Sequence, residues 1–176
     1  MPLQSAGVLL FRRTAGATEF LLVHPGGPFW AKKDEGAWSI PKGVYQEPES
    51  AVDAARRELQ EEIGLAITGD LLELGKFKQP SGKVVSVWAA ERDFDVGELR
   101  SNTFLMEWPP KSGRRTEFPE VDRAGWFPFA EAATKITRGQ LPILMKLAAE
   151  LGIGGDAKLL AQRTSVSPAR AARSAS

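Results

Sequence analysis

The chain has 176 residues, of which 43% are hydrophobic and 26% are charged, as is ordinary for a globular protein with a buried core. Its formal net charge of +1 gives no overall basic field, so the sequence gives no strong indication of nucleic-acid binding. Cysteine is absent, which excludes disulfides, thiolate metal sites and cysteine nucleophiles.

Two short apolar runs, at residues 6–12 and 19–24, predict a pair of strands joined by a loop. The only histidine, His24, ends the second run, and we interpret it as a packing or hydrogen-bonding residue. A loop rich in Pro and Gly follows over residues 25–37. Aromatic side chains there could stack on a base while lysines bind phosphate, or one aromatic could simply anchor a surface loop. These side chains are Phe29, Trp30, Lys32 and Lys33.

The most clearly marked element is a helix between Ser50 and Gly64, which follows an extended segment at residues 38–43. Ser50 is a favourable N-cap, and Gly64 suits the left-handed conformation that often ends a helix. At 100° per residue, apolar side chains form one stripe along this helix, which we expect to pack on the core. The stripe consists of Val52, Ala55, Leu59 and Ile63.

A neighbouring face of this helix carries three carboxylates, because spacings of three and four residues bring Glu58, Glu61 and Glu62 together. Like charges at this spacing are unfavourable unless a cation lies among them, and a hard divalent cation such as Mg²⁺ suits carboxylate oxygens. A solvated acidic face, with Arg56 and Arg57 as counter-charges, would account for the same pattern. Both interpretations fit the helix taken alone.

Beyond the helix, alternating runs predict strands at residues 71–78 and 84–91, with a turn between them, and another at 103–108. Residues 109–122 are expected to form a long polar loop, of a kind that is often functional. A short strand at 125–129 and helices around 130–136 and 141–151 should follow. From Gly152 onward the composition changes to Ala, Arg, Ser and Gly, which predicts a domain over 1–152 and a flexible tail over 153–176.

The stretch from Gly43 to Leu65 resembles the Nudix box, whose pattern is Gly-x5-Glu-x7-Arg-Glu-apolar-x-Glu-Glu-x-Gly-apolar. Every specified position matches, namely Gly43, Glu49, Arg57, Glu58, Leu59, Glu61, Glu62, Gly64 and Leu65. The resemblance implies an α/β fold, specifically an α/β/α sandwich with a mixed central sheet, in which the box forms a loop-helix-loop. It also implies a hydrolase that uses Mg²⁺ or Mn²⁺ to cleave a diphosphate linked to a nucleoside.

The resemblance further assigns roles within the box. The implied metal ligands are the Lys42 carbonyl and the carboxylates of Glu58, Glu61 and Glu62. Arg57 is expected to support catalysis by pairing with Glu49, which holds the loop against the helix, while Gly43 and Gly64 set the backbone geometry. The general base is expected to be a box glutamate or a glutamate outside the box, either Glu117 or Glu120.

The segment from Trp38 to Gly43 is similar to the one that precedes the box in dinucleoside polyphosphate and diphosphoinositol polyphosphate hydrolases. Several cationic side chains could together bind a long phosphate chain, with Trp30 against a base. They are Lys32, Lys33, Lys42, Arg114 and Arg115. We therefore expect a pyrophosphohydrolase of nucleoside polyphosphates, with dinucleoside polyphosphates among its substrates.

Other interpretations remain open. The diadenosine tetraphosphate branch usually has a tyrosine soon after the box, whereas the only tyrosine here is Tyr45. Pro80 stands at the spacing that marks ADP-ribose pyrophosphatases, although a turn explains it equally well, so hydrolysis of ADP-ribose or a nucleotide sugar is one alternative. A nucleotide-sensing domain without catalysis is the other.

The expected partner is thus a small nucleotide. Neither a signal peptide nor an apolar run of the roughly 20 residues that span a membrane is visible, so we expect a cytoplasmic protein with no membrane partner. The resemblance is also compatible with a homodimer.

Overall fold

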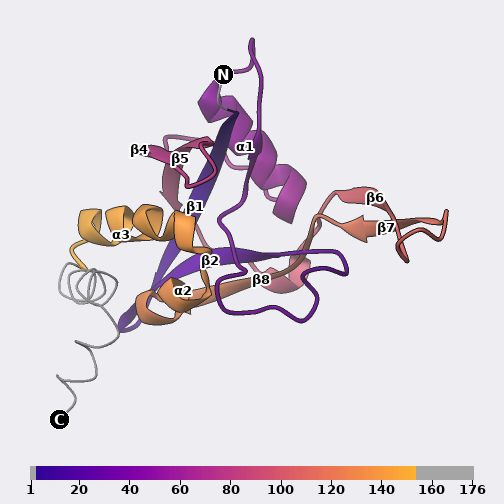
Figure 1. The fold of residues 1–176 in the computed structure, drawn as a ribbon. Helices are drawn as coiled ribbons and strands as arrows, with labels where there is room; N and C mark the ends of the chain where they lie inside the picture. The colour runs from indigo at the N-terminus through magenta and orange to yellow at the C-terminus, as the bar shows by residue number, and fades with distance from the viewer. Residues whose placement is uncertain (1–2, 154–176) are drawn as a thin grey trace, which may run out of the picture.

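The protein is described by a computed structural model over residues 3–153, so the predicted tail lies, but for residue 153, outside the described residues (Figure 1). A mixed sheet with the order β4-β5-β1-β2-β8 forms its centre, and β3 pairs with β1. The strands are β1 (Gln4–Thr14), β2 (Ala17–Pro25), β3 (Lys42–Val44), β4 (Leu72–Lys78), β5 (Val84–Glu91) and β8 (Val121–Pro128). β1 and β5 run parallel, and the other neighbours are antiparallel.

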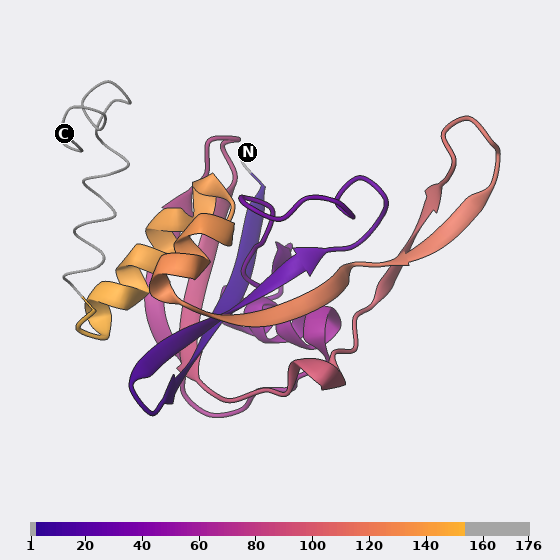
Figure 2. The same cartoon turned by 90° about the horizontal axis from the view of Figure 1, so that it is seen from below.

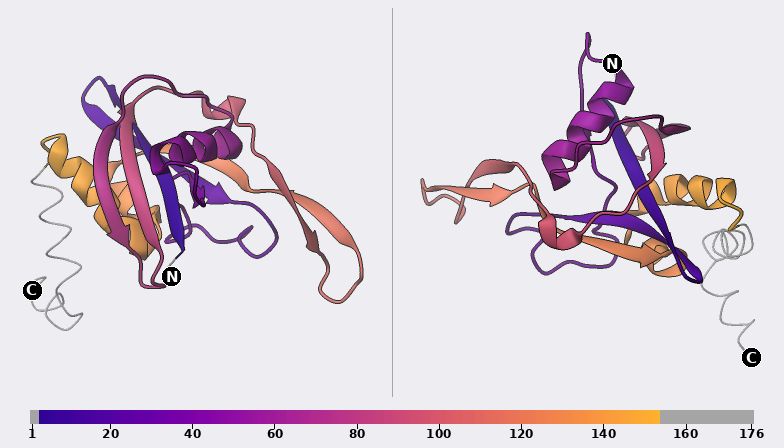
Figure 3. Two further views of the ribbon diagram at one scale, coloured as in Figure 1. Left: turned by 90° about the horizontal axis from the view of Figure 1, so that it is seen from above. Right: turned by 180° about the vertical axis from the view of Figure 1, so that it is seen from behind.

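Helices cover both faces of this sheet (Figure 3). α1 (Ala51–Ile63) packs on one face, while α2 (Phe129–Lys135) and α3 (Leu141–Glu150) pack on the other. The alternation of side chains along β1 produces the two cores, since Val8 and Leu10 lie toward α1, whereas Leu9 and Phe11 lie toward α2 and α3. The α/β/α sandwich with a mixed sheet is thereby confirmed. Two short 3₁₀ helices complete it, η1 (Val96–Glu98) and η2 (Arg138–Gln140).

One edge of β1 is shared by two neighbours. Its C-terminal half forms a hairpin with β2, in which Phe11 lies opposite Phe20. Its N-terminal half pairs instead with β3, in which Lys42 lies opposite Gly7. Because β3 begins the segment that leads to α1, the first strand of the protein fixes the position of that segment.

The ends of α1 are those predicted from the sequence. The hydroxyl of Ser50 accepts a hydrogen bond from the Asp53 amide at 3.3 Å, and Gly64 ends the helix with φ of 84°. The apolar stripe differs from the prediction at its start, where Val52 is only half-buried and Ala54 is buried instead. The helix therefore contacts the sheet mainly from its second turn onward.

A second, two-stranded sheet projects from the body of the protein (Figure 2). It is formed by β6 (Thr103–Glu107) and β7 (Arg115–Pro119), and we call it the ribbon. The prediction of a polar loop over 109–122 is wrong in its second half, because residues 115–119 form a strand and β8 begins at Val121. Exposed and partly buried side chains alternate from Arg115 to Phe118, as they do in strands with one covered face. Among residues 3–153, no helix combines the length and the apolar character needed to cross a bilayer.

Candidate active site

Arg57 lies at the centre of the polar contacts of the box. Its guanidinium donates two hydrogen bonds to the carboxylate of Glu49, at 2.8 and 3.0 Å, which is the bidentate geometry of a strong ion pair. These bonds lower the pKa of Glu49. Arg57 also donates to Glu58 at 2.9 Å and to Glu61 at 3.1 Å. A single side chain thus joins the loop before α1 to two of the three helix carboxylates.

β3 passes so close to α1 that a side chain larger than hydrogen would not fit at Gly43. A Cβ atom added there would overlap the carboxyl group of Glu58. Glu58 is itself buried, and this burial raises the pKa of its carboxyl, although the charge of Arg57 opposes the effect. Strand backbone and helix carboxylate are therefore in direct contact.

Glu62 faces the first residue of β3. Its Oε2 accepts a hydrogen bond from the amide N–H of Lys42 at 3.1 Å, so the observed contact uses the amide of Lys42 rather than its carbonyl. Burial raises the pKa of Glu62 to about 8, and the nearby charge of Glu58 adds to the effect. Burial also lowers the pKa of the Lys42 ammonium, against the attraction of Glu62. The pair closes the gap between β3 and the last turn of α1.

Glu120 approaches the box from outside it. It lies between β7 and β8, where its N–H donates to the carbonyl of Asn102 at 2.8 Å, and the Asn102 N–H donates to the carbonyl of Glu61 at 2.7 Å. Glu120 is exposed as a whole, but local desolvation, followed by the charge of Glu61, raises the pKa of its carboxyl. Glu117 lies on the ribbon instead, where its carboxylate accepts a hydrogen bond from the hydroxyl of Thr103. Of these two glutamates, Glu120 is the one whose charge reaches the box.

The donor set of the box fits a hard divalent cation. Within residues 3–153, no three acidic or histidine side chains already converge as a ligand set, since Arg57 and the Lys42 amide hold the carboxylate oxygens. Yet Glu58 and Glu62 are carboxylates in a site where burial disfavours their charge. A cation would compensate that cost, and oxygen ligands on one helix face leave coordination positions open for substrate and water.

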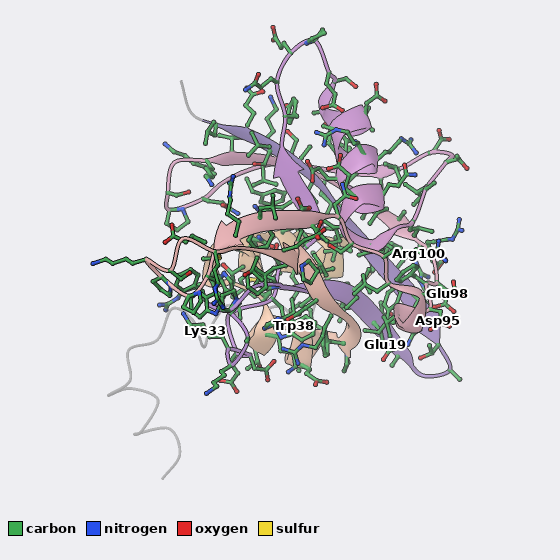
Figure 4. All side chains as sticks on the ribbon, turned by 90° about the vertical axis from the view of Figure 1, so that its right-hand side faces the viewer. Glu19, Lys33, Trp38, Asp95, Glu98 and Arg100 are labelled. Atoms are coloured by element: carbon green, nitrogen blue, oxygen red, sulfur yellow. The ribbon has the colours of Figure 1, made fainter. Side chains whose placement is uncertain are left out.

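The side chains expected to bind substrate are spread over several elements. Lys32 and Lys33 line a cavity of about 540 Å³ together with Trp38 and Arg123. Lys33 and Trp38 lie on a different side of the molecule from Asp95, Glu98 and Arg100, which surround η1 (Figure 4). Trp30 follows β2, Lys42 opens β3, and Arg114 and Arg115 are exposed on the ribbon. Their joint binding of one phosphate chain stays a prediction.

The buried side chain of Gln140, which is 2% exposed, has a role that was not predicted from the sequence. Its Oε1 accepts the amide N–H of Ile40 at 2.9 Å, and its Nε2 donates to the hydroxyl of Ser39 at 2.9 Å, which ties the segment before the box to η2. No local pattern marks this glutamine, because its partners lie 100 residues earlier or more. His24 is, as expected, a hydrogen-bonding residue, buried between the Asp122 carboxylate and the Lys33 carbonyl.

Replacing Gly43 by Ala is expected to lower kcat/KM by at least about tenfold, which corresponds to a loss of about 1.4 kcal/mol. The added methyl group forces the Glu58 carboxylate out of its place against β3. The measurement is steady-state kinetics over a Mg²⁺ titration, with Val44→Ala as the control, because Val44 neighbours it on β3 with an exposed side chain. An unchanged kcat/KM in Gly43→Ala would show that the position of Glu58 is immaterial.

In the absence of metal, the protein is expected to lose stability as the pH rises from about 4.5 to about 8. Folding raises the pKa of Glu62 from 4.5 to about 8, so between these values the folded state binds more protons than the unfolded state. The contribution of Glu62 to the free energy of unfolding is fully present below pH about 4.5 and is lost as the pH rises past about 8. The slope of this loss is no more than about 1.4 kcal/mol per pH unit. Urea denaturation in EDTA measures this slope, which Glu62→Gln should reduce. The same slope in both proteins would contradict the prediction.

Comparison with known proteins agrees with this geometry. A family model described as the NUDIX domain matches residues 1–147. Among curated proteins, the chain is similar to the bis(5'-nucleosyl)-tetraphosphatase [asymmetrical] of Sus scrofa. The two are 34% identical over an alignment 109 residues long, which covers 54% of this chain and 70% of the pig protein.

Solved structures show the same fold. A C. elegans Ap4A hydrolase binary complex aligns with a TM-score of 0.61 and 22% identity, over 84% of this chain and 98% of that chain. The NUDIX domain of Shewanella oneidensis NrtR complexed with ADP ribose also aligns with a TM-score of 0.61, at 18% identity, over 86% of this chain and 89% of that chain. Because the family model spans most of the chain and the box is intact, the chain belongs to the Nudix family of hydrolases, which act on phosphoric anhydride bonds.

Proposed function

We propose that the chain is a metal-dependent pyrophosphohydrolase of nucleoside polyphosphates and that dinucleoside polyphosphates are its preferred substrates. The observation that carries the proposal is the group of carboxylates that Arg57 and β3 hold together, namely Glu58, Glu61 and Glu62, with Glu120 beside them. The pig relative, named as a tetraphosphatase of bis-nucleosyl substrates, supports the choice of substrate class.

In this proposal the carboxylates of Glu58, Glu61 and Glu62 hold Mg²⁺ or Mn²⁺. Such an ion, when bound, neutralises charge on the diphosphate and lowers the pKa of a bound water. Glu120 accepts the proton of the attacking water, a task that the raised pKa of its carboxyl suits at neutral pH. Arg57 keeps Glu58 and Glu61 in place through its hydrogen bonds.

The alternative of ADP-ribose hydrolysis finds no specific support in the site. Pro80 follows Gln79 in the β4–β5 turn, which is closed by a hydrogen bond from the Gly82 N–H to the Gln79 carbonyl at 2.9 Å. Proline is favoured at the second position of such turns, so the turn accounts for it. The ADP ribose bound to the NrtR domain belongs to a protein that is 18% identical to this chain.

The test is a chromatographic product analysis with diadenosine tetraphosphate, ATP, ADP-ribose and a nucleotide sugar, each with Mg²⁺ or Mn²⁺. We expect diadenosine tetraphosphate to be cleaved fastest, and EDTA to abolish cleavage. Faster cleavage of ADP-ribose to AMP and ribose 5-phosphate would overturn the substrate assignment. Nucleotide binding without cleavage of any substrate would favour a sensing domain instead.

A further inference from the structure

Two aromatic side chains that follow β2 are exposed, although large apolar side chains usually lie inside. Phe29 is 62% exposed and Trp30 is 40% exposed. The ring of Phe29 meets the ring of Trp108 edge to face, with a centroid distance of 5.7 Å, and Trp108 directly follows β6 of the ribbon. Phe29 and Trp108 therefore form a partly exposed aromatic surface between this loop and the ribbon, and together with the neighbouring Trp30 we call them the aromatic ledge.

Cations accompany the aromatic ledge. The ammonium of Lys33 lies 5.0 Å from the centroid of the Trp30 ring. On the ribbon, the Trp108 amide donates to the carbonyl of Arg114 at 2.9 Å, so an exposed arginine stands directly across from Trp108. An aromatic surface alone would suit any apolar partner, whereas aromatic rings beside exposed cations suit a ligand that combines a flat ring with negative charge. A nucleotide has this composition.

The loop that carries the aromatic ledge is fixed to the base of the ribbon, next to the candidate general base, while Trp108 stands at the outer end of the ribbon. Gly26 donates its N–H to the carbonyl of Glu120 at 2.9 Å, and a Cβ atom at Gly26 would overlap the carbonyl of Pro119. The loop thus starts beside Glu120 and runs along the ribbon, where Gly27 lies against the ring of Phe104 and Phe29 meets Trp108. A ligand with its phosphates at the box can extend along this joint.

We propose that the aromatic ledge binds the second nucleoside of a dinucleoside polyphosphate whose phosphate chain lies at the box. The inference rests on the proposed function and adds a reason for the preference between substrates. A mononucleoside polyphosphate can occupy the box but leaves the ledge empty, whereas a dinucleoside polyphosphate contacts both. The preference for the dinucleoside substrate then depends on the loop and the ribbon, whereas the chemistry depends on α1.

The test compares diadenosine tetraphosphate with adenosine 5'-tetraphosphate, which has the same phosphate chain and one nucleoside fewer. In the double variant Phe29→Ala/Trp30→Ala, kcat/KM for diadenosine tetraphosphate should fall about 5- to 150-fold, the range expected for losing the stacking of one base. The value for adenosine 5'-tetraphosphate should change less than about threefold. Leu105→Ala is the matched control, because Leu105 is 58% exposed on the ribbon. Side chains alternate along a strand, so Leu105 lies on the face opposite to Phe104, whose ring approaches Gly27 of the loop.

The outcomes separate the two proposals. If the wild-type protein cleaves neither compound, the proposed function fails. If it cleaves diadenosine tetraphosphate and the double variant keeps the full preference for it, the function stands and the aromatic ledge is not the second subsite. An equal loss for both compounds would also overturn the inference, because the ledge would then act on the nucleoside that they share. Thermal unfolding of each variant shows that the fold is retained.

Discussion

Glu62→Gln is expected to lower kcat by at least about 10³-fold in saturating Mg²⁺. The neutral amide keeps the size of the side chain and can still accept the Lys42 N–H, but it removes a negative oxygen from the proposed ligand set. Several kcal/mol of transition-state stabilisation depend on the metal, and each 1.4 kcal/mol corresponds to a factor of ten. Single-turnover cleavage of diadenosine tetraphosphate, with isothermal titration of Mn²⁺, measures both effects.

The matched control for this variant is Asp53→Asn, which removes one negative charge from the exposed part of the first turn of α1. It should retain nearly full activity, so a large loss there would indicate that the total charge of the helix matters. A Glu62→Gln protein that keeps its Mn²⁺ affinity and at least a tenth of wild-type kcat would remove Glu62 from the ligand set. Glu58 and Glu61 would then have to hold the ion.

Glu120→Gln is expected to lower kcat by about 10²- to 10⁴-fold with little change in KM, as is typical when a general base is removed. Since the pKa of Glu120 is raised, wild-type kcat should increase with pH through that pKa as the carboxyl ionises, and the variant should lack this limb of the profile. Kinetics between pH 5 and 9 at fixed Mg²⁺ check both points.

Glu117→Gln provides the comparison, because this glutamate lies on the ribbon with its carboxylate bonded to Thr103. We expect its activity to stay within about threefold of wild type, as for surface substitutions away from a site. Should Glu120→Gln lose less than about fivefold while Glu117→Gln or a box variant loses more, the base lies elsewhere.

Local patterns predicted the elements that depend on neighbours in the chain. Both ends of α1 follow from the residues that occupy them, since a serine hydroxyl caps the first turn and a glycine takes the left-handed position after the last. The ion pair of Arg57 with Glu49 is likewise present as the box resemblance implies. These contacts join residues at most eight positions apart, which a fixed spacing can encode.

Contacts between distant segments were beyond the reach of such patterns. That Gln140 would bond to Ile40, or that Phe29 would meet Trp108, depends on how the fold brings together segments far apart in the sequence. The ribbon was predicted in part, because the strand expected at 103–108 corresponds to β6, whereas the second run, Arg115–Pro119, shows no alternation of apolar and polar residues. The many charged side chains of the second run favoured the loop interpretation, although charge is common on strands exposed to solvent.

The ribbon leaves and rejoins the body of the protein at one point, where the hydrogen bond between Glu120 and Asn102 brings its two ends together. A segment whose ends meet in this way can be lengthened, trimmed or exchanged without displacing the elements around it. Within a lineage of such enzymes, inherited changes in the ribbon would alter which molecules are held, while the glutamates of α1 remain under separate selection. Substrate preference could therefore change during evolution while the glutamates of α1 stay the same.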